Sequence, residues 1–246
     1  MGTDAPRELE AVDIGHIVVG DHQGDVGIGL EDVERLLAAF GRADLEIVAL
    51  EPRGEQRARR LAAEGYLVLI TDFYGEPVAS FQASFPLAEK LRADNDFYRA
   101  RIIAGIDALR ALPEAAGLTV FAIGHCMGGQ AVLEAARAGQ DLAGVVSFHG
   151  TLPTTAPAKP GTIRPRILIC HGDADPLAPR DTVIGFWEEM DAAGADWHFH
   201  SYGHVKHGFT DPESPAKNLE FLDYSVSADR QSWASMLSFF DEILGA

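Results

Sequence analysis

The sequence predicts an α/β fold in which a mostly parallel central sheet is flanked by helices on both faces. Short apolar runs alternate along the chain with longer amphipathic runs, and several of the short runs are continuous and rich in Val and Ile. Continuous apolar strands are typical of sheets that helices cover on both sides. The alternation of strands with helices is typical of the crossover connections that make neighbouring strands parallel.

Seven short segments are predicted as strands. They are Asp13–Val19, Leu45–Glu51, Tyr66–Thr71, Leu118–Ile123, Ala143–Phe148, Arg166–Cys170 and Asp196–Tyr202. Six longer segments between and after them are predicted as helices. They are Leu30–Phe40, Glu55–Glu64, Asp96–Leu112, Met127–Ala138, Arg180–Ala193 and Ala228–Leu244. In Asp96–Leu112 the apolar residues recur at helical spacing, and Pro113 follows the last turn.

Two segments show neither the helical nor the strand periodicity of apolar residues. Gly75–Ala93 and Thr151–Pro165 are expected to be irregular, and long irregular segments are where pocket rims and lids are found. The strand and helix rhythm resumes after each of them, so neither is expected to be a linker. We therefore expect residues 1–246 to form a single domain.

Composition and charge narrow the classes of partner. The 246 residues carry a formal net charge of −17, which repels phosphate backbones and anionic lipid surfaces. No apolar run is long enough to span a bilayer, and the first residues do not resemble a secretory signal. We expect a cytoplasmic protein, monomeric or a small homo-oligomer, that binds no nucleic acid and no membrane.

The segment Gly124-His125-Cys126-Met127-Gly128-Gly129 lies between a predicted strand and a predicted helix. Strand, Gly-x-Cys-x-Gly and helix form the thiol version of a nucleophile elbow, in which glycines allow a strained turn to pack closely. The helix start favours a thiolate at Cys126, and the backbone N–H of Met127 is expected to face a developing oxyanion. The alternative is a structural cysteine in a glycine-rich turn.

The other cysteine, Cys170, lies inside the apolar run RILIC and is expected to be a small core residue. Two cysteines do not make a disulfide framework, so both thiols are expected to be reduced.

An enzyme with this elbow needs an acid and then a histidine further along the chain, each after a strand. The acid loop HGDADPLAP offers Asp173 and Asp175, and the loop GHVKHGF offers His204 and His207. From the residues alone, either member of each pair qualifies.

A second interpretation of the histidine-rich region is a zinc site. His198 and His200 alternate along a predicted strand, close in sequence to the two loop histidines. No nearby cysteine completes a zinc ligand set, so we expect no metal and no other cofactor.

The chain resembles the dienelactone hydrolase family of α/β-hydrolases. The resemblance runs from about Glu51 onward and is weak over residues 1–44, a divergent part of the same domain. It rests on RRLAAEGYLVLITDFYG, AIGHCMGG, VVSFHG, HGDADPLAP, YGHVKHGFT and YSVSADRQSWASMLSFF. By position it implies Asp175 as the acid and His207 as the base, with Asp175 orienting the imidazole that takes the thiol proton.

The resemblance also implies an accessory catalytic glutamate that holds the resting thiol. The pattern Glu-x-x-Gly is met by Glu51-Pro52-Arg53-Gly54, although a carboxylate that caps a loop is an equal alternative. In the family the residue after this glutamate donates a backbone N–H to the oxyanion, and the loop that follows is longer. Pro52 has no N–H, so this chain departs from the family there.

The predicted function is hydrolysis of a carboxylic ester or lactone through Cys126, His207 and Asp175, with a covalent acyl-enzyme intermediate. A thioesterase would use the same residues. The alternative from another class is a catalytically weakened relative that binds a small carboxylate or lactone, which the Pro52 loop favours. Tyr74 and His149 lie in regions where substrate contacts are expected.

Overall fold

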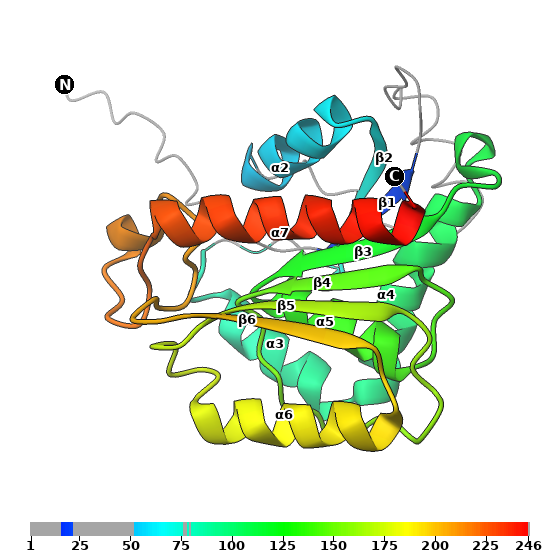
Figure 1. Ribbon diagram of the computed structural model, residues 1–246. Helices are drawn as coiled ribbons and strands as arrows, with labels where there is room; N and C mark the ends of the chain where they lie inside the picture. The colour runs from blue at the N-terminus through cyan, green and yellow to red at the C-terminus, as the bar shows by residue number, and fades with distance from the viewer. Residues whose placement is uncertain (1–15, 22–51, 76–77, 79, 246) are drawn as a thin grey trace.

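The computed structural model of the protein describes residues 16–21, 52–75, 78 and 80–245 (Figure 1). Its described strands form a sheet in the order β2-β1-β3-β4-β5-β6. The strands are β1 (His16–Asp21), β2 (Tyr66–Thr71), β3 (Val120–His125), β4 (Gly144–Phe148), β5 (Arg166–Gly172) and β6 (Trp197–Tyr202). Strands β3 to β6 are parallel to one another, whereas β1 is antiparallel to both of its neighbours.

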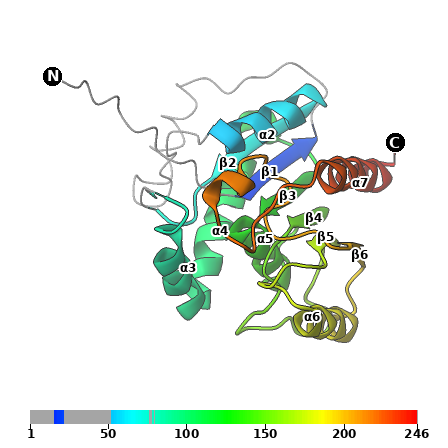
Figure 2. The same ribbon diagram turned by 90° about the vertical axis from the view of Figure 1, so that its left-hand side faces the viewer.

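The described helices lie in two layers, one on each face of the sheet (Figures 1 and 2). They are α2 (Pro52–Ala63), α3 (Ser84–Ala93), α4 (Asn95–Arg110), α5 (Met127–Arg137), α6 (Arg180–Ala193) and α7 (Val226–Leu244), with the 3₁₀ turns η1 (Pro113–Ala115) and η2 (Ser214–Lys217). Helices α2 and α7 cover one face, and α3, α4, α5 and α6 cover the other.

Alternate residues of the central strands fill two separate cores. In β5, Ile167 and Ile169 pack with α5 and α6, whereas Leu168 and Cys170 pack with α7 on the opposite face. This alternation explains why the strand is apolar without interruption, since both of its faces are buried. The predicted fold class is confirmed, and Cys170 is the fully buried core residue that its position in RILIC predicted.

Most described elements differ from the expected bounds by only one or two residues, and two differences are larger. Residues Ser84–Ala93, which lie within a segment expected to be irregular, form α3. Helix α2 begins at Pro52, three residues before the predicted start, because proline is well suited to the first position of a helix. The predicted elements Leu30–Phe40 and Leu45–Glu51 lie outside the described residues, as does the first half of Asp13–Val19.

Long apolar helices of the kind that cross membranes are not found in the part of the chain that the structure describes.

Candidate active site

Cys126 occupies a sharp turn between β3 and α5. Its backbone has φ 53° and ψ −118°, in the left-handed region that residues with a Cβ rarely adopt. The turn is possible because Gly124 has no Cβ. A Cβ at this position would lie 2.0 Å from the carbonyl oxygen of Gly128. A Cβ at Gly129 would likewise meet Ser147 of β4 and Gly150, which follows that strand. The glycines therefore let the helix start directly above the strand end, as the elbow motif predicted.

The turn is also held by its neighbour β4. The N–H of Cys126 donates to the carbonyl of Phe148 at 3.0 Å and to Nδ1 of His149 at 3.2 Å. Nδ1 must then be the unprotonated nitrogen of a neutral His149 ring, so Nε2 carries the proton. Nε2 lies 2.8 Å from the hydroxyl of Thr210, to which it donates.

His207 connects the thiol to a carboxylate. Its Nε2 lies 3.1 Å from Sγ of Cys126, and its Nδ1 lies 2.7 Å from Oδ2 of Asp175. The other oxygen of Asp175 accepts the backbone N–H of Leu177 at 2.8 Å, which fixes the carboxylate. Both His207 and Asp175 are buried, whereas Cys126 is partly exposed. The three residues follow β3, β5 and β6, whose carboxyl ends meet at one edge of the sheet.

The competing candidates lie away from the thiol. Asp173 is paired at the surface with Arg180, at 2.7 Å between Oδ2 and a guanidinium nitrogen. His204 is exposed in a turn with φ 64°. Geometry thus favours Asp175 over Asp173 and His207 over His204, as the family resemblance implied.

The charge state of His207 reflects its neighbours. Burial alone lowers the pKa of its imidazole, but the charge of Cys126 and the hydrogen bonds with Asp175 and Cys126 outweigh burial and raise the pKa to about 10. The arrangement therefore favours the imidazolium form of His207 at neutral pH.

A cavity of about 540 Å³ opens beside the thiol, on the side of α3 and the start of α5. Its lining is largely apolar, with a few polar side chains from α3, α5 and the loops. It is formed by Tyr74, Phe81, Ser84, Phe85, Ala88, Glu89, Arg92, Cys126, Met127, Gln130, Thr151, Pro153, Leu177 and Phe221. A mainly apolar cavity of this size with a few polar groups is typical of a small-molecule site.

The expected accessory residues fall in different places. Tyr74 lines the cavity, and Met127 lines it as the first residue of α5, where backbone N–H groups lack helical partners. His149 is buried behind the turn and outside the cavity lining, so the expected substrate contact does not fit its position. Glu51 lies outside the described residues.

Several lining residues could not be assigned from sequence. Phe81, Phe85 and Arg92 lie in the segment expected to supply a pocket rim, but no periodicity distinguished them. Gln130 was not singled out, although it stands four residues after Cys126 and helical spacing would have indicated that it lies on the side of the thiol. Phe221 carried no sequence signal.

The histidine cluster does not come together as a metal site. His198 and His200 lie on β6 beside a shallow surface depression that they share with Glu242, whereas His207 faces Cys126. Within residues 16–21, 52–75, 78 and 80–245, no group of three or more His, Cys, Asp or Glu side chains is placed to hold a metal ion.

The parallel sheet, its two helical layers and the turn after β3 define the α/β-hydrolase fold. The model of the dienelactone hydrolase family matches residues 46–244, and the chain belongs to this family.

The chain is also similar to three individual proteins. The structure called m3DLH is 36% identical, with a TM-score of 0.73 over 79% of this chain and 82% of its own. The dienelactone hydrolase-like promiscuous phosphotriesterase P91, from metagenomic libraries, is 33% identical with a TM-score of 0.69 over the same shares. The Caenorhabditis elegans protein K02A2.1, described as uncharacterized, is 36% identical over 151 residues, 60% of this chain and 95% of the relative.

Proposed function

We propose that the protein hydrolyses carboxylic esters or lactones with an apolar body, using Cys126 as nucleophile, His207 as acid and base, and Asp175 as the residue that orients His207. The observation that carries the proposal is the hydrogen-bonded chain from Sγ of Cys126 through His207 to Asp175, at 3.1 Å and 2.7 Å. Membership of a family of hydrolases supports the same reaction class.

In the first half of the reaction, the Cys126 thiolate attacks the ester carbonyl carbon, and the carbonyl oxygen becomes an oxyanion. The N–H of Met127 is proposed to donate to this oxyanion. The C–O bond then breaks, and the His207 imidazolium gives its proton to the departing alkoxide. In the second half, His207 takes a proton from water as the water oxygen attacks the thioester. The acid is released and Cys126 regains its sulfur electron pair.

Tyr74 is proposed as a further donor to the bound ester. Burial and the nearby charge of Cys126 raise the pKa of its phenol, so the hydroxyl stays protonated over the working pH range. A second donor matters in this chain because Pro52 has no backbone N–H to offer. The role of Glu51 stays a prediction.

The cavity lining favours the binding of esters that carry a sizeable apolar group. Phe81, Phe85, Leu177 and Phe221 form apolar walls, and burying such a group contributes about 25 cal/mol for each Å² removed from water. The charge of Arg92 is already engaged by Glu89 at 3.1 Å, and its Nε donates to Gln130 at 2.9 Å. We therefore expect neutral aryl and medium-chain esters to be better substrates than esters that carry a second carboxylate.

The test compares the wild type with Cys126→Ala on p-nitrophenyl butyrate, phenyl acetate and an enol lactone. Hydrolysis should fall by at least about 10³-fold in the variant, and a thioester-linked acyl group should appear on Cys126 in quenched wild-type samples by mass spectrometry. Cys170→Ala is the control, because this second thiol lies in the core and should leave turnover unchanged. Equal rates in wild type and Cys126→Ala would reject the mechanism, and binding without turnover would favour the ligand-binding alternative.

Phosphotriester hydrolysis is a second candidate activity, favoured by the likeness to P91. The same thiolate would attack phosphorus and expel an aryloxide, which takes the His207 proton, and water would then break the S–P bond. Paraoxon turnover that disappears in Cys126→Ala would support this activity. If Cys126 is phosphorylated and the S–P bond is not hydrolysed, paraoxon is an inhibitor and not a substrate.

A further inference from the structure

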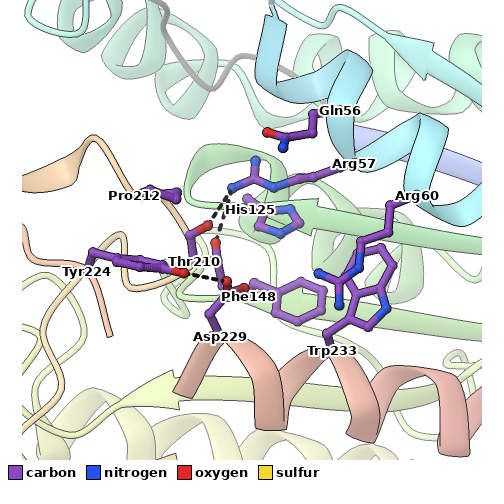
Figure 3. Close-up of a pocket in the computed structure, with 10 residues that line it drawn as sticks. All are labelled: Gln56, Arg57, Arg60, His125, Phe148, Thr210, Pro212, Tyr224, Asp229 and Trp233. Atoms are coloured by element: carbon purple, nitrogen blue, oxygen red, sulfur yellow. Dashed lines mark hydrogen bonds between the residues drawn. The ribbon is translucent and has the colours of Figure 1, made fainter. Parts of the chain in front are cut away.

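A second cavity lies on the opposite face of the sheet from the one that Cys126 lines. It has a volume of about 230 Å³ and is bounded by α2, α7, the ends of β3 and β4, and the segment after His207 (Figure 3). Among the residues that the structure describes, its lining shares none with that of the larger cavity. The turn that holds Cys126 separates the two, since His125 lines one and Cys126 the other.

Two arginines of α2 enter this second cavity from the same side. Arg57 and Arg60 are three residues apart, which places both on one face of the helix. Arg57 donates to the hydroxyl of Thr210 at 3.2 Å and to its carbonyl at 3.4 Å. The guanidinium of Arg60 lies 3.8 Å from the centre of the Trp233 ring. Each arginine is therefore held in a defined orientation at the cavity wall, as Figure 3 shows.

Cations outnumber anions among the described residues that line the cavity, in contrast to the chain as a whole. The formal net charge of the protein is −17, yet the charged side chains in this described part of the lining are Arg57, Arg60 and Asp229. Burial raises the pKa of Asp229, and its carboxylate is already bonded by the hydroxyl of Tyr224 at 3.0 Å. The carboxylate that most directly opposes an incoming anion is thus partly satisfied within the protein.

Four of the other lining residues are aromatic, namely His125, Phe148, Tyr224 and Trp233. Trp233 and Phe148 are buried, and Phe148 stacks on the ring of His125 with centroids 4.5 Å apart. Burial and the neighbouring charge of Arg57 hold the pKa of His125 well below its usual value, so this ring is neutral. The described residues therefore place two cations and the carboxylate of Asp229 around flat, uncharged rings.

We propose that this cavity is a second ligand site, distinct from the catalytic one, for a small organic carboxylate. Its carboxylate group would bind between Arg57 and Arg60, and its apolar body would lie against Trp233 and Phe148. The guanidinium forks match a carboxylate in geometry and charge, and the volume suits a ligand of roughly benzoate size. The proposal does not depend on the hydrolase mechanism, because none of these residues takes part in it.

The test uses sodium benzoate and the fluorescence of Trp233, measured in a Trp187→Phe/Trp197→Phe background. These two tryptophans stack on each other between α6 and β6, away from the cavity. Benzoate should change the Trp233 emission saturably. Arg60→Gln and Arg57→Gln should each weaken binding by about tenfold or more, since each removes a charged donor pair. Calorimetry of the unsubstituted protein provides the second measurement if the background variant does not fold.

Arg59→Gln is the matched control, because Arg59 is an exposed arginine of the same helix that does not line the cavity. It changes the net charge equally and should leave the affinity unchanged, as should Cys126→Ala. No saturable benzoate response would overturn the proposal. Equal losses of benzoate affinity in Arg59→Gln and Arg60→Gln would contradict a specific site, because they would show that only the net charge matters. Binding of inorganic phosphate but not of benzoate would exclude a carboxylate as the ligand.

Discussion

At the scale of single residues, His207 is fixed by partners on both of its ring nitrogens. Asp175 accepts from Nδ1, so the imidazole cannot rotate away from Cys126. The raised pKa of about 10 means that His207 binds its proton more tightly in the folded protein than in the unfolded chain. This contribution to stability is complete below the ordinary pKa of 6.5 and is lost as the pH rises toward about 10.

The first prediction concerns this pKa. Asp175→Asn should lower the pKa of His207, because the neutral amide no longer stabilises the imidazolium, and kcat/KM should fall by about 10²-fold or more. The pKa is measured by NMR titration of the imidazole, and the alkaline limb of the kcat/KM profile should move to lower pH with it. Asp173→Asn is the control, since that carboxylate pairs with Arg180 at the surface. Equal shifts in both variants would contradict a specific role for Asp175.

His149 is predicted to position Cys126 rather than to contact substrate. It accepts the N–H of Cys126 from outside the cavity lining and has a left-handed backbone with φ 40°. His149→Phe removes the acceptor and should lower kcat by about tenfold with little change in KM. His149→Asn keeps an acceptor near the Nδ1 position and tolerates this backbone, so it should recover much of kcat. A rise in KM in both variants would instead support the substrate contact.

At the scale of the elements, the turn between β3 and α5 depends on close backbone packing. Gly124→Ala would place its Cβ against the backbone of Gly128, which cannot move without displacing α5. The variant should be destabilised by at least about 1–3 kcal/mol and lose activity as Cys126 shifts. Gly185→Ala is the control, because this exposed position of α6 has nothing near its added Cβ and should gain about 0.5–1 kcal/mol. Urea denaturation measures both, and equal stability would contradict the packing argument.

Elements whose apolar faces are buried were predictable from the sequence, and α3 shows why others were not. Helix α6 was predicted with its observed bounds, and the elbow Gly-x-Cys-x-Gly was found from five residues. In α3, Phe85 is 45% exposed beside the catalytic cavity instead of being buried in the core. Pro86 sits in the first turn, where a helix tolerates it, and Ala83 offers no capping side chain. A helix used to line a cavity therefore lacks the apolar periodicity of a core helix.

At the scale of the whole molecule, the candidate site exists only because separate strand ends meet. Sequence order predicted the acid and the base, and the family resemblance selected Asp175 and His207. The apolar cavity could not be predicted, because Leu177, Phe221 and Phe81 come from three distant segments. Their contact depends on how the loops and α3 pack, which no local pattern records.

The packing of the helices on the cavity side is organised by a buried ionic network. Arg137 of α5 pairs with Glu134 at 3.0 Å and with Glu189 of α6 at 2.7 Å, and it donates to the carbonyl of Leu152 at 2.8 Å. Arg99 of α4 reaches the second oxygen of Glu134 at 2.8 Å. The network therefore joins three helices to the loop that carries Thr151 and Pro153 into the catalytic cavity.

Arg137→Leu is predicted to destabilise the protein by about 3–5 kcal/mol, because it leaves two carboxylates without their buried cation. It should also raise KM, since the loop beside Leu152 loses an anchor. Arg164→Leu removes the same charge from a pair whose side chains are 64% and 84% exposed, and should cost less than about 1 kcal/mol. Denaturant unfolding and ester kinetics on both variants check the prediction. If Arg137→Leu were as stable as Arg164→Leu, the buried network would be replaceable by apolar packing, and the cavity loop would have to be held by other contacts.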